Sequence, residues 1–382
     1  MSKRYEVIVI GVGGMGSAAA YHLASRGVDT LGIERFDIPH NRGSSHGVTR
    51  IIRRGQYEDS EYVPLADRSY ELWRELESIT GRNLLHVTGG IDAGPADGDV
   101  FPSSRDSCRE HDIDHELLSG TEVNNRFPGY DIPADHQAVY QPESGFLVPE
   151  KCIIAHVEAA QERGAEIHGR ERVTEVSSEP GSGVRVETDR DMYHADEVVV
   201  TAGAWAREFL PELADKLVPV RQVLAWLQPS DPSLFDPESF PVFIHETATE
   251  RYYGFPRFDV PGFKFARFNH FAEEVDPDEM SREPSGADEE MLRAYARTHF
   301  PEGAGPTMRL STCLFTNTPD GHFIVDTAPG RSHVTVGAGF SGHGFKFASA
   351  IGEVLADLAL DGQTNRNVRL FTADRFGQGS GG

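Results

Sequence analysis

The tetrapeptide Gly-Phe-Lys-Phe occurs twice in this chain, at residues 262–265 and again at 344–347. Its lysines, Lys264 and Lys346, are two of only five lysines in 382 residues, and arginine supplies most of the 36 basic side chains. A lysine between two phenylalanines is expected to lie in the interior, where a charged amine needs a partner or a task. These two side chains are therefore the first candidates for chemistry.

A glycine-rich turn stands near the start of the chain, in "YEVIVIGVGGMGSAAAYHLASRGVDTLGIER". Residues 5–10 are typical of a buried parallel strand and 30–33 of a second strand, with an alanine-rich helix between them that ends at Ser25. The turn has the G-x-G-x-x-G pattern, followed about 20 positions later by an acidic residue (Gly11, Gly13, Gly16 and Glu34). In a dinucleotide-binding unit the helix N-terminus holds the pyrophosphate and the carboxylate holds the ribose hydroxyls. That carboxylate would repel a 2′-phosphate, which disfavours NADP.

A second polar cluster follows in "RGSSHGVTRIIRR", which contains Ser44, Ser45 and His46. Arg50 and Arg53 are three residues apart, so on a helical turn both guanidinium groups would point the same way. Two parallel guanidinium forks suit a carboxylate or the electron-rich edge of a flavin. A solvated basic face is the alternative interpretation of the same residues.

Two later segments repeat the pattern of a strand that enters a small-residue turn, "DMYHADEVVVTAGAW" and "HVTVGAGFSGHGFKFASAIGEVLADLAL". Because they lie far apart yet look like parts of one parallel sheet, we expect a discontinuous nucleotide-binding domain. The stretches between them are turn-rich or contain alternating strands such as "ERYYGFPRF". The sequence predicts an α/β (α+β two-domain) fold, in which an antiparallel-sheet substrate domain is inserted into a Rossmann-type domain. The Rossmann-type domain comprises residues 1–84, 148–215 and 318–382. The substrate domain comprises residues 85–147 and 216–317.

The composition is strongly acidic, with 60 acidic against 36 basic residues and a formal net charge of −24. Such self-repulsion is tolerated where molar salt screens the charges, so we expect a salt-adapted, halophilic protein. The same field disfavours nucleic acid and anionic membranes as partners. No apolar run approaches the roughly 18 residues of a membrane span. A strand pattern begins at once in place of a signal peptide, so we expect a cytoplasmic protein.

The cysteines Cys108, Cys152 and Cys313 are odd in number and far apart, and no C-x-x-C motif is present. This pattern disfavours a disulfide framework and a zinc site, and we expect no metal. One of the three cysteines can still take part in chemistry.

The motifs together identify a family. "GVGGMG", "GSSHGVTRIIRR", "TAGAW", "YYGFP", "STCLFTNTPDGHFIVD" and "GFSGHGFKFASAIGEVL" strongly resemble monomeric sarcosine oxidase and N-methyltryptophan oxidase. These enzymes are FAD-dependent amine oxidases of the glycine oxidase and D-amino-acid oxidase group. The likeness runs in order along nearly the entire chain. It implies FAD as cofactor, a Rossmann-type FAD-binding domain and a monomer.

The resemblance implies roles for the cysteine and the lysines. The cysteine of "STCLFTNTPDGHFIVD" carries FAD through a thioether in that family, and Cys313 occupies its place, whereas a buried hydrophobe is the alternative interpretation. Lys346 would pair with Arg53 on the substrate carboxylate. Lys264 would lie on the opposite face of the flavin, where oxygen reacts and a fixed positive charge stabilises developing anions. In the alternative interpretation, each lysine extends its amine past the phenylalanines to water.

Further site residues carry over by resemblance. His46 and Arg50 match positions that adjoin the flavin ring, and Tyr253 of "YYGFP" matches an aromatic side chain of the substrate pocket. Together with Lys264 and His270 these are the candidate catalytic residues. The residues expected to bind the cofactor are Gly11, Gly13, Gly14, Met15, Gly16, Glu34, Arg35, Ser44, Ser45, Val173, Trp205, Cys313, Gly342, His343, Gly344, Phe345 and Lys346.

The chain departs from the family pattern at two positions. The usual tyrosine two residues after the flavin-linked cysteine is Phe315 here, which removes a hydroxyl from the substrate pocket. The family also has a histidine shortly after the first Gly-Phe-Lys-Phe lysine, and here the spacing offers Phe268, Asn269 or His270. His270 is the preferred candidate, with a structural hydrogen bond as the alternative role.

The resemblance implies a reaction. A secondary amino acid, sarcosine in the first instance, is oxidised by FAD to an imine, which water hydrolyses to formaldehyde and glycine while O₂ becomes hydrogen peroxide. Three alternatives remain open. The substrate can be another amine, such as N-methyltryptophan, pipecolate, glycine or a D-amino acid; the acceptor can be a carrier protein; or the chain can bind FAD or an amine without catalysis.

Overall fold

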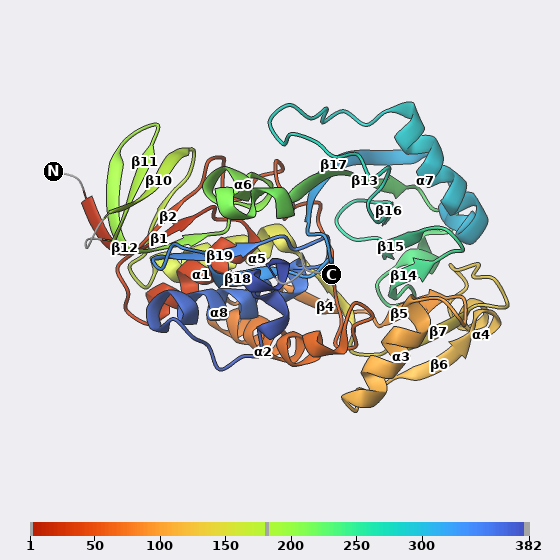
Figure 1. Cartoon of the computed structure of the whole chain (residues 1–382). Helices are drawn as coiled ribbons and strands as arrows, with labels where there is room; N and C mark the ends of the chain where they lie inside the picture. The colour runs from red at the N-terminus through yellow and green to blue at the C-terminus, as the bar shows by residue number, and fades with distance from the viewer. Residues whose placement is uncertain (1–2, 180–182, 378–382) are drawn as a thin grey trace.

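The computed structural model describes residues 3–179 and 183–377. In this part of the chain, two eight-stranded sheets are accompanied by a smaller sheet of three strands. The two large sheets form separate lobes that lie side by side (Figure 1). Each sheet carries its own helices and its own apolar clusters.

The first sheet consists of β1 (Lys3–Ile10), β2 (Thr30–Ile33), β9 (Glu166–His168), β10 (Val173–Glu179), β11 (Gly183–Thr188), β12 (Met192–Val200), β18 (Ile324–Thr327) and β19 (Val334–Ala338). β1 runs parallel to β2 and β12, β2 to β9, and β12 to β19. β10, β11 and β18 add antiparallel edges. The C-terminal half of β1, residues 7–10, is buried on both faces, as its unbroken apolar run predicts.

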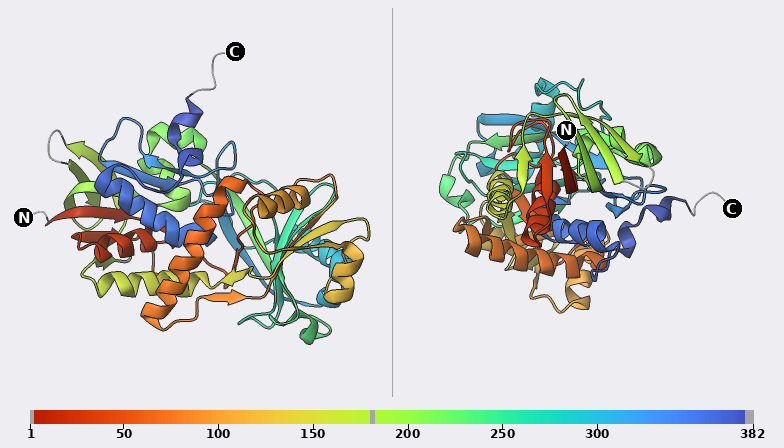
Figure 2. Two further views of the ribbon diagram at one scale, coloured as in Figure 1. Left: turned by 90° about the horizontal axis from the view of Figure 1, so that it is seen from below. Right: turned by 90° about the vertical axis from the view of Figure 1, so that its left-hand side faces the viewer.

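One side of this sheet is covered by helices. Figure 2 shows them gathered together, and they share one apolar cluster. α1 packs against α5 and α8, and α2 against α8. A Cβ at Gly352 would lie 2.5 Å from that of Ala18, so α8 approaches α1 closely because both positions are small. The bounds of these helices are α1 (Gly14–Ser25), α2 (Val63–Thr80), α5 (Pro149–Gln161) and α8 (Ala348–Asp361). The short α6 (Ala206–Phe209) follows β12.

The second sheet has the order β17-β13-β16-β15-β14-β5-β7-β6. Its neighbours are antiparallel except β5 and β14, which run parallel. Its strands are β5 (Gly90–Gly94), β6 (Glu116–Ser119), β7 (Gln137–Gln141), β13 (Val218–Leu227), β14 (Val242–Glu246), β15 (Arg251–Phe255), β16 (Phe263–Arg267) and β17 (Thr307–Asn317). The accompanying helices are α3 (Val100–Glu110), α4 (Gly120–Arg126) and α7 (Gly286–His299).

Alternation along β16 decides which side chains face the site. Phe263 and Phe265 belong to the apolar cluster beneath α7. Ala266 joins the cluster on the opposite face, which contains Cys313 and Phe315. Because successive side chains of a strand point to opposite faces, Lys264 shares this second face. The phenylalanines of the first tetrapeptide thus hold the strand in the core while its lysine points away from them.

A smaller sheet has three strands, with β8 in the centre and β3 and β4 on either side of it. Their bounds are β3 (Arg50–Ile52), β4 (Leu85–Val87) and β8 (Gly145–Leu147). Its first strand corrects one prediction, because Arg50 and Arg53 do not share a helical turn. Arg50 opens β3, and the two guanidinium groups bond to different partners. An extended backbone separates side chains that a helix would have aligned.

The strands of the first large sheet fall within 1–84, 148–215 and 318–382, and those of the second within 85–147 and 216–317. The domain limits themselves stay a prediction. Within the described ranges, no helix is both long enough and apolar enough to cross a membrane.

Candidate functional site

The glycine-rich turn connects β1 to α1 and packs tightly against β12. Gly11 has φ +89°, and a Cβ there would lie 2.7 Å from the carbonyl oxygen of Thr201. A Cβ at Gly16 would lie only 1.8 Å from the carbonyl oxygen of Gly11. At Gly13 it would meet nothing within 4 Å. The turn is therefore closed toward the sheet and open on one side, where the first amides of α1 lack intrahelical acceptors.

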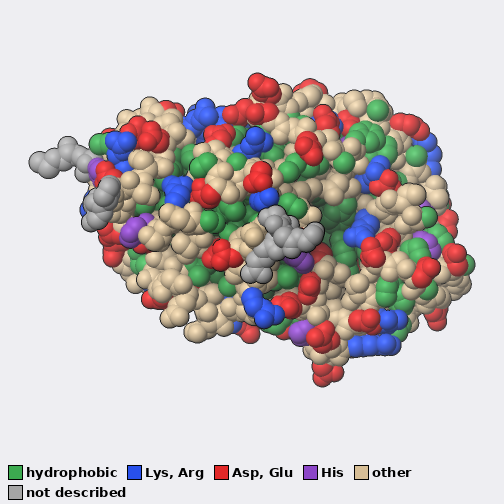
Figure 3. Space-filling view, viewed as in Figure 1, with side chains coloured by type: hydrophobic (Ala, Val, Ile, Leu, Met, Phe, Trp, Pro, Cys, Tyr) green, Lys and Arg blue, Asp and Glu red, His purple; other side chains and the backbone are tan. Residues whose placement is uncertain are grey.

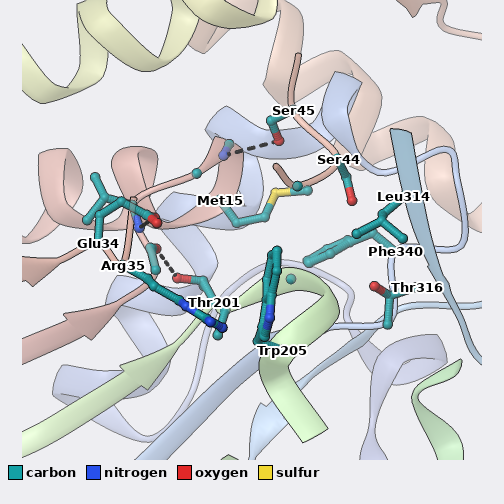
Figure 4. Close-up of a pocket in the computed structure, with 18 of the residues that line it drawn as sticks. Met15, Glu34, Arg35, Ser44, Ser45, Thr201, Trp205, Leu314, Thr316 and Phe340 are labelled. Carbon is teal, nitrogen blue, oxygen red and sulfur yellow. Dashed lines mark hydrogen bonds between the residues drawn. The ribbon is translucent and has the colours of Figure 1, made fainter. Parts of the chain in front are cut away.

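A long cavity begins at this opening. It encloses about 1330 Å³ of atom-free space, including its mouth. Figure 4 shows Glu34 and Arg35 at one end, Ser44, Leu314 and Thr316 at the other, and Met15 between them. Fifteen residues expected at the site line it, namely Gly11, Gly13, Gly14, Met15, Glu34, Arg35, Ser44, Ser45, Arg50, Val173, Trp205, Phe315, Gly342, Gly344 and Phe345.

Glu34 and its neighbours form the first end of the cavity. The Glu34 carboxylate accepts hydrogen bonds from the amides of Val12 and Phe36, each at 2.9 Å. The Arg35 guanidinium lies 5.1 Å from the ring of Phe36 and 5.5 Å from that of Trp205. This end thus combines a fixed carboxylate with a flat cationic and aromatic wall, which suits a nucleoside.

Arg50 and Cys313 meet at the other end. The guanidinium of Arg50 donates to the carbonyl oxygens of Thr49 at 2.8 Å and Ser44 at 2.7 Å. Its Nη2 also lies 3.6 Å from the sulfur of Cys313, which is buried. Ser45 accepts a hydrogen bond from the amide of Gly14 at 3.3 Å and so ties this end to α1.

Lys264 is buried beside this end, in β16. Its Nζ donates to the carbonyl oxygens of Gly47 at 2.7 Å and Thr49 at 2.8 Å, and to the hydroxyl of Thr49 at 2.9 Å. Three acceptors match the three N–H groups of an ammonium. Burial, followed by the charge of Arg50, holds the pKa of Lys264 well below its usual range. The alternative in which this lysine extends to water is wrong, because the side chain is 2% exposed.

The turn that holds Lys264 is itself fixed by a carboxylate. Glu150, in the first turn of α5, accepts hydrogen bonds from the amides of Gly47 at 2.7 Å and Val48 at 3.1 Å. Val48 has φ +75°, a strained conformation for a β-branched residue. The strain persists because Glu150 binds the amides of the turn while Lys264 binds its carbonyl oxygens.

His46 precedes this turn and is 3% exposed. Burial, and then the charges of Arg50 and Lys264, lower its pKa to about 3. The imidazole is therefore neutral at physiological pH. Its Nε2 is buried and has no hydrogen-bond partner among the residues that the structure describes.

Arg53 and Lys346 converge on one carboxylate. Arg53 Nη2 lies 2.9 and 2.8 Å from the two carboxylate oxygens of Glu58, and Lys346 Nζ lies 3.4 Å from Oε1 of the same group. Burial raises the pKa of Glu58, but Arg53 and Lys346 outweigh it and hold the pKa below its usual range. Burial lowers the pKa of Lys346 to about 8. The two cations thus form a buried receptor for a carboxylate.

The candidate residues Tyr253 and Phe315 share an apolar cluster with Cys313. Tyr253 stacks edge-on against Phe268, and their ring centroids lie 4.9 Å apart. Gly342 has φ +81°, and a Cβ there would lie 2.5 Å from the ring of Phe315. The loop after β19 can therefore approach this ring only with glycine at that position.

The structure does not bring His270 to the cavity. Its Nε2 lies 2.6 Å from the carboxylate of Asp288, which also pairs with Arg221 at 2.9 Å. Asp288 stands in the first turn of α7 and completes a capping box with Ser285. Asn269, the residue before His270, accepts a hydrogen bond from the Asn317 side chain. The arrangement is that of a structural hydrogen bond, the alternative role considered for His270.

Several of the residues expected at the site do not line the cavity. His343 Nε2 bonds to the carbonyl oxygen of Gly321 at 3.0 Å, so its ring turns away from the cavity. His46 lines a second pocket, which shares Arg35 and His40 with this cavity. The other expected site residues that do not line the cavity are Gly16, Arg53, Tyr253, Lys264, Cys313 and Lys346.

Sequence reasoning missed several residues. Thr201 lines the cavity and donates to the carbonyl oxygen of Gly11 at 2.8 Å, and its place in "TAGAW" after a strand was a usable signal. Glu58 and Asp92, the partners of Arg53, were also missed. Asp92 interrupts the buried strand β5, and a charge at such a position could have been noticed. Nothing in the sequence around Glu58 distinguishes it from a surface carboxylate.

Comparison with known proteins agrees with this geometry. Residues 6–358 match the family described as FAD dependent oxidoreductase. The chain belongs to this family. It is 41% identical over 380 residues to monomeric sarcosine oxidase from Bacillus sp. (strain B-0618), covering 98% of this chain and 97% of that protein. It is 36% identical over 376 residues to N-methyl-L-tryptophan oxidase from Yersinia pestis (strain Pestoides F), covering 97% and 99%.

A solved structure shows the same architecture. NikD, an amino acid oxidase essential for nikkomycin biosynthesis, is 26% identical, with a TM-score of 0.84 over 97% of this chain and 98% of that one. The mixed α/β fold with its two lobes is therefore that of an FAD-dependent oxidase. The prediction of an FAD-dependent family from sequence motifs is confirmed.

The residues of the cavity fit FAD. Gly13 leaves open space above the N-terminus of α1, which suits a pyrophosphate, and Glu34 stands where a ribose would lie. Gly11 and Gly16 have no room for a side chain, so the turn keeps that shape. The same cavity also reaches Arg50, whose Nη2 lies 3.6 Å from the sulfur of Cys313.

Proposed function

We propose that this chain oxidises a secondary amino acid that carries an N-methyl group, with sarcosine as the first candidate. The observation that carries the proposal is the convergence of Arg53 and Lys346 on one carboxylate, with Lys346 directly after Phe345, which lines the cavity. Relatives at 41% and 36% identity are named for sarcosine and N-methyl-L-tryptophan. Both substrates combine an N-methyl amine with a carboxylate.

Bound FAD would supply the redox chemistry: the N-methyl amine loses two electrons and two protons, one from the methyl carbon and one from the nitrogen, to become an imine, and O₂ takes up both electrons and both protons as hydrogen peroxide. Water then hydrolyses the imine to formaldehyde and glycine. The chain's own residues bind and orient the substrate. Its carboxylate takes the place of Glu58 on Arg53 and Lys346, while Tyr253 and Phe315 form an apolar wall.

Lys264 supplies a positive charge on the other side of the site, because its three acceptors stabilise the ammonium form against the burial that lowers its pKa. Its ammonium is held by three acceptors within a 2%-exposed environment, so it cannot turn away or be screened by water. Such a charge stabilises anions that form when O₂ is reduced. We propose O₂, rather than a carrier protein, as the acceptor.

We propose that the flavin is attached covalently to Cys313. This cysteine is buried directly before Leu314, which lines the cavity, and Nη2 of the cavity residue Arg50 lies 3.6 Å from its sulfur.

The chain is further proposed to be a halophilic, cytoplasmic monomer. Its formal net charge of −24 is unfavourable for a compact state at low salt. Figure 3 shows acidic side chains spread over the visible face rather than gathered in one patch. Thermal unfolding should therefore shift upward as KCl is raised from 0.1 to 2 M. An unchanged or falling melting temperature would contradict salt adaptation.

A substrate of another size is the second candidate, because Phe315 stands in the pocket without a hydroxyl.

Carboxylate recognition is tested by comparing sarcosine with its uncharged amide in anaerobic flavin reduction. Loss of a charge-assisted contact costs about 1.5–3 kcal/mol, so half-saturation with the amide should rise about 10- to 100-fold. Equal half-saturation would remove the role assigned to Arg53 and Lys346.

A further inference from the structure

Arg53 contacts two carboxylates of different character. Glu58 belongs to the loop after β3, and its side chain is 12% exposed. Asp92 lies in the middle of β5, and its side chain is 3% exposed, with Oδ2 at 3.5 Å from Arg53 Nη1. The first stands in a loop, whereas the second is built into a sheet. A ligand that competes for Arg53 therefore meets one replaceable partner and one fixed partner.

Hydrogen bonds from two other elements anchor Asp92. Ser104, in α3, donates from its hydroxyl to Asp92 Oδ2 at 2.7 Å. Gln141, in β7, donates from Nε2 to the same oxygen at 3.3 Å and accepts at Oε1 from the amide of Gly55 at 2.9 Å. Gly55 in turn accepts from Arg53 Nη1 at 2.9 Å. These contacts form a closed network that holds Arg53 at Nη1, whereas Glu58 binds it at Nη2.

The charges of this group balance. With Arg53 and Lys346 as cations and Glu58 and Asp92 as carboxylates, the formal charges sum to zero. Burial raises the pKa of Asp92, and the charge of Arg53 and the hydrogen bond from Ser104 act against that rise. His343, 3.7 Å from Glu58, is neutral because burial lowers its pKa to about 4. If a monocarboxylate replaces Glu58, the balance is kept. A dicarboxylate would add an uncompensated negative charge in a buried place, which is costly.

We propose that Asp92 is a positioning and specificity-determining residue of the carboxylate site: it holds Arg53 when Glu58 gives way, and it restricts the site to ligands with one negative charge. The proposal rests on the proposed function, since it takes Arg53 and Lys346 as the substrate receptor. It assigns this enzyme to monocarboxylate amines and excludes those with a second acidic group near the first.

The test uses holoenzyme at pH 7, below the pKa of Lys346, and two ligands of equal size, malonate and its half-amide malonamate, which differ by one charge. Binding is followed by the change in visible flavin absorbance. Wild type should require at least tenfold more malonate than malonamate for half-saturation. Equal half-saturation by the two ligands in wild type would overturn the proposal without any variant.

The variant Asp92→Asn separates charge from structure. All three contacts of Asp92 are made by Oδ2, so the asparagine oxygen can accept the same hydrogen bonds while the charge is lost. The malonate-to-malonamate ratio should fall at least threefold. The matched control is Asp67→Asn, which removes a carboxylate from the neighbouring Arg54 at the surface and should leave the ratio unchanged. If Asp92→Asn does not fold, Asp92→Ser removes the charge and keeps a hydroxyl.

An unchanged ratio in the Asp92 variant, with a lower melting temperature, would make Asp92 merely structural and overturn the proposal. Flavin reduction by sarcosine in the same holoenzyme reports the proposed function separately. If sarcosine reduces the flavin and the ratio is unchanged, only the role of Asp92 fails. If sarcosine does not reduce the flavin and neither ligand alters its spectrum, the carboxylate site and the role of Asp92 fail together.

Discussion

Replacing Lys264 by methionine removes the buried ammonium and keeps much of the side chain's apolar length. The amine lies 4.2 Å from the ring centroid of Phe255 and 5.5 Å from that of Trp226, so a thioether meets favourable neighbours there. The substrate receptor formed by Arg53 and Lys346 is not touched. We expect reoxidation of the reduced flavin by O₂ to slow, while reduction by substrate stays largely intact.

The size of the effect follows from the burial of the charge. A unit charge acting over about 7 Å in an effective dielectric of about 20 stabilises an opposite charge by about 2.4 kcal/mol. That free energy corresponds to about 50-fold in rate. Loss of Lys264 also leaves the carbonyl oxygens of Gly47 and Thr49 without this donor, at about 1 kcal/mol each. Removal of a buried charge offsets part of that cost, so the variant should fold.

The assay measures the two half-reactions separately by rapid mixing. Flavin reduction is followed without oxygen, and the reduced protein is then mixed with buffer of known O₂ concentration. Lys346→Met serves as the reciprocal control, because it should weaken substrate binding and leave reoxidation unchanged. Lys216→Met, at an exposed ion pair with Asp215, should change neither step.

Equal slowing of both half-reactions in Lys264→Met would refute the reasoning, since it would place the lysine at the substrate. Unchanged reoxidation would equally refute it. A 50-fold slower reoxidation with a reduction rate within threefold of wild type is the predicted result.

Three further predictions concern other parts of the site. Acid precipitation of the holoprotein should give a yellow pellet, and Cys313→Ser should release the colour into the supernatant; a colourless wild-type pellet would contradict covalent attachment. Affinity for acetate should fall as the pH rises through about 8, the pKa of Lys346, because deprotonation removes one of two cations; a flat profile from pH 7 to 9 would speak against this. His270→Asn should lower the melting temperature by weakening a contact of Asp288, with flavin reduction unaffected; slower reduction at unchanged stability would reverse that assignment.

Local pattern was sufficient to predict the cofactor end of the site. The strand, glycine turn and helix at 5–25 follow one another in the chain, so their arrangement depends on short-range rules of periodicity and backbone freedom. The placement of Lys264 was accessible for the same reason. In a strand with phenylalanines on either side, the lysine must occupy the face opposite to theirs.

The substrate end depended on contacts that the sequence does not display. Arg53 was expected to share a helical turn with Arg50, but β3 pairs with β8, nearly a hundred residues later, and that pairing makes the backbone extended. The two counter-ions of Arg53 come from different places: Glu58 from the loop after β3, and Asp92 from β5 of the second large sheet. His270 met Asp288 through α7 in the same way. Long-range packing decides such partners, and residue type and spacing alone do not.

The central claim is that this FAD-dependent oxidoreductase takes electrons from an N-methyl amino acid. The direct measurement is anaerobic: holoprotein in molar KCl is mixed with excess sarcosine, and the visible absorbance of the flavin is followed with time. The account predicts rapid bleaching, with return of the colour when air is admitted. Colour that persists under sarcosine and under N-methyltryptophan would contradict it.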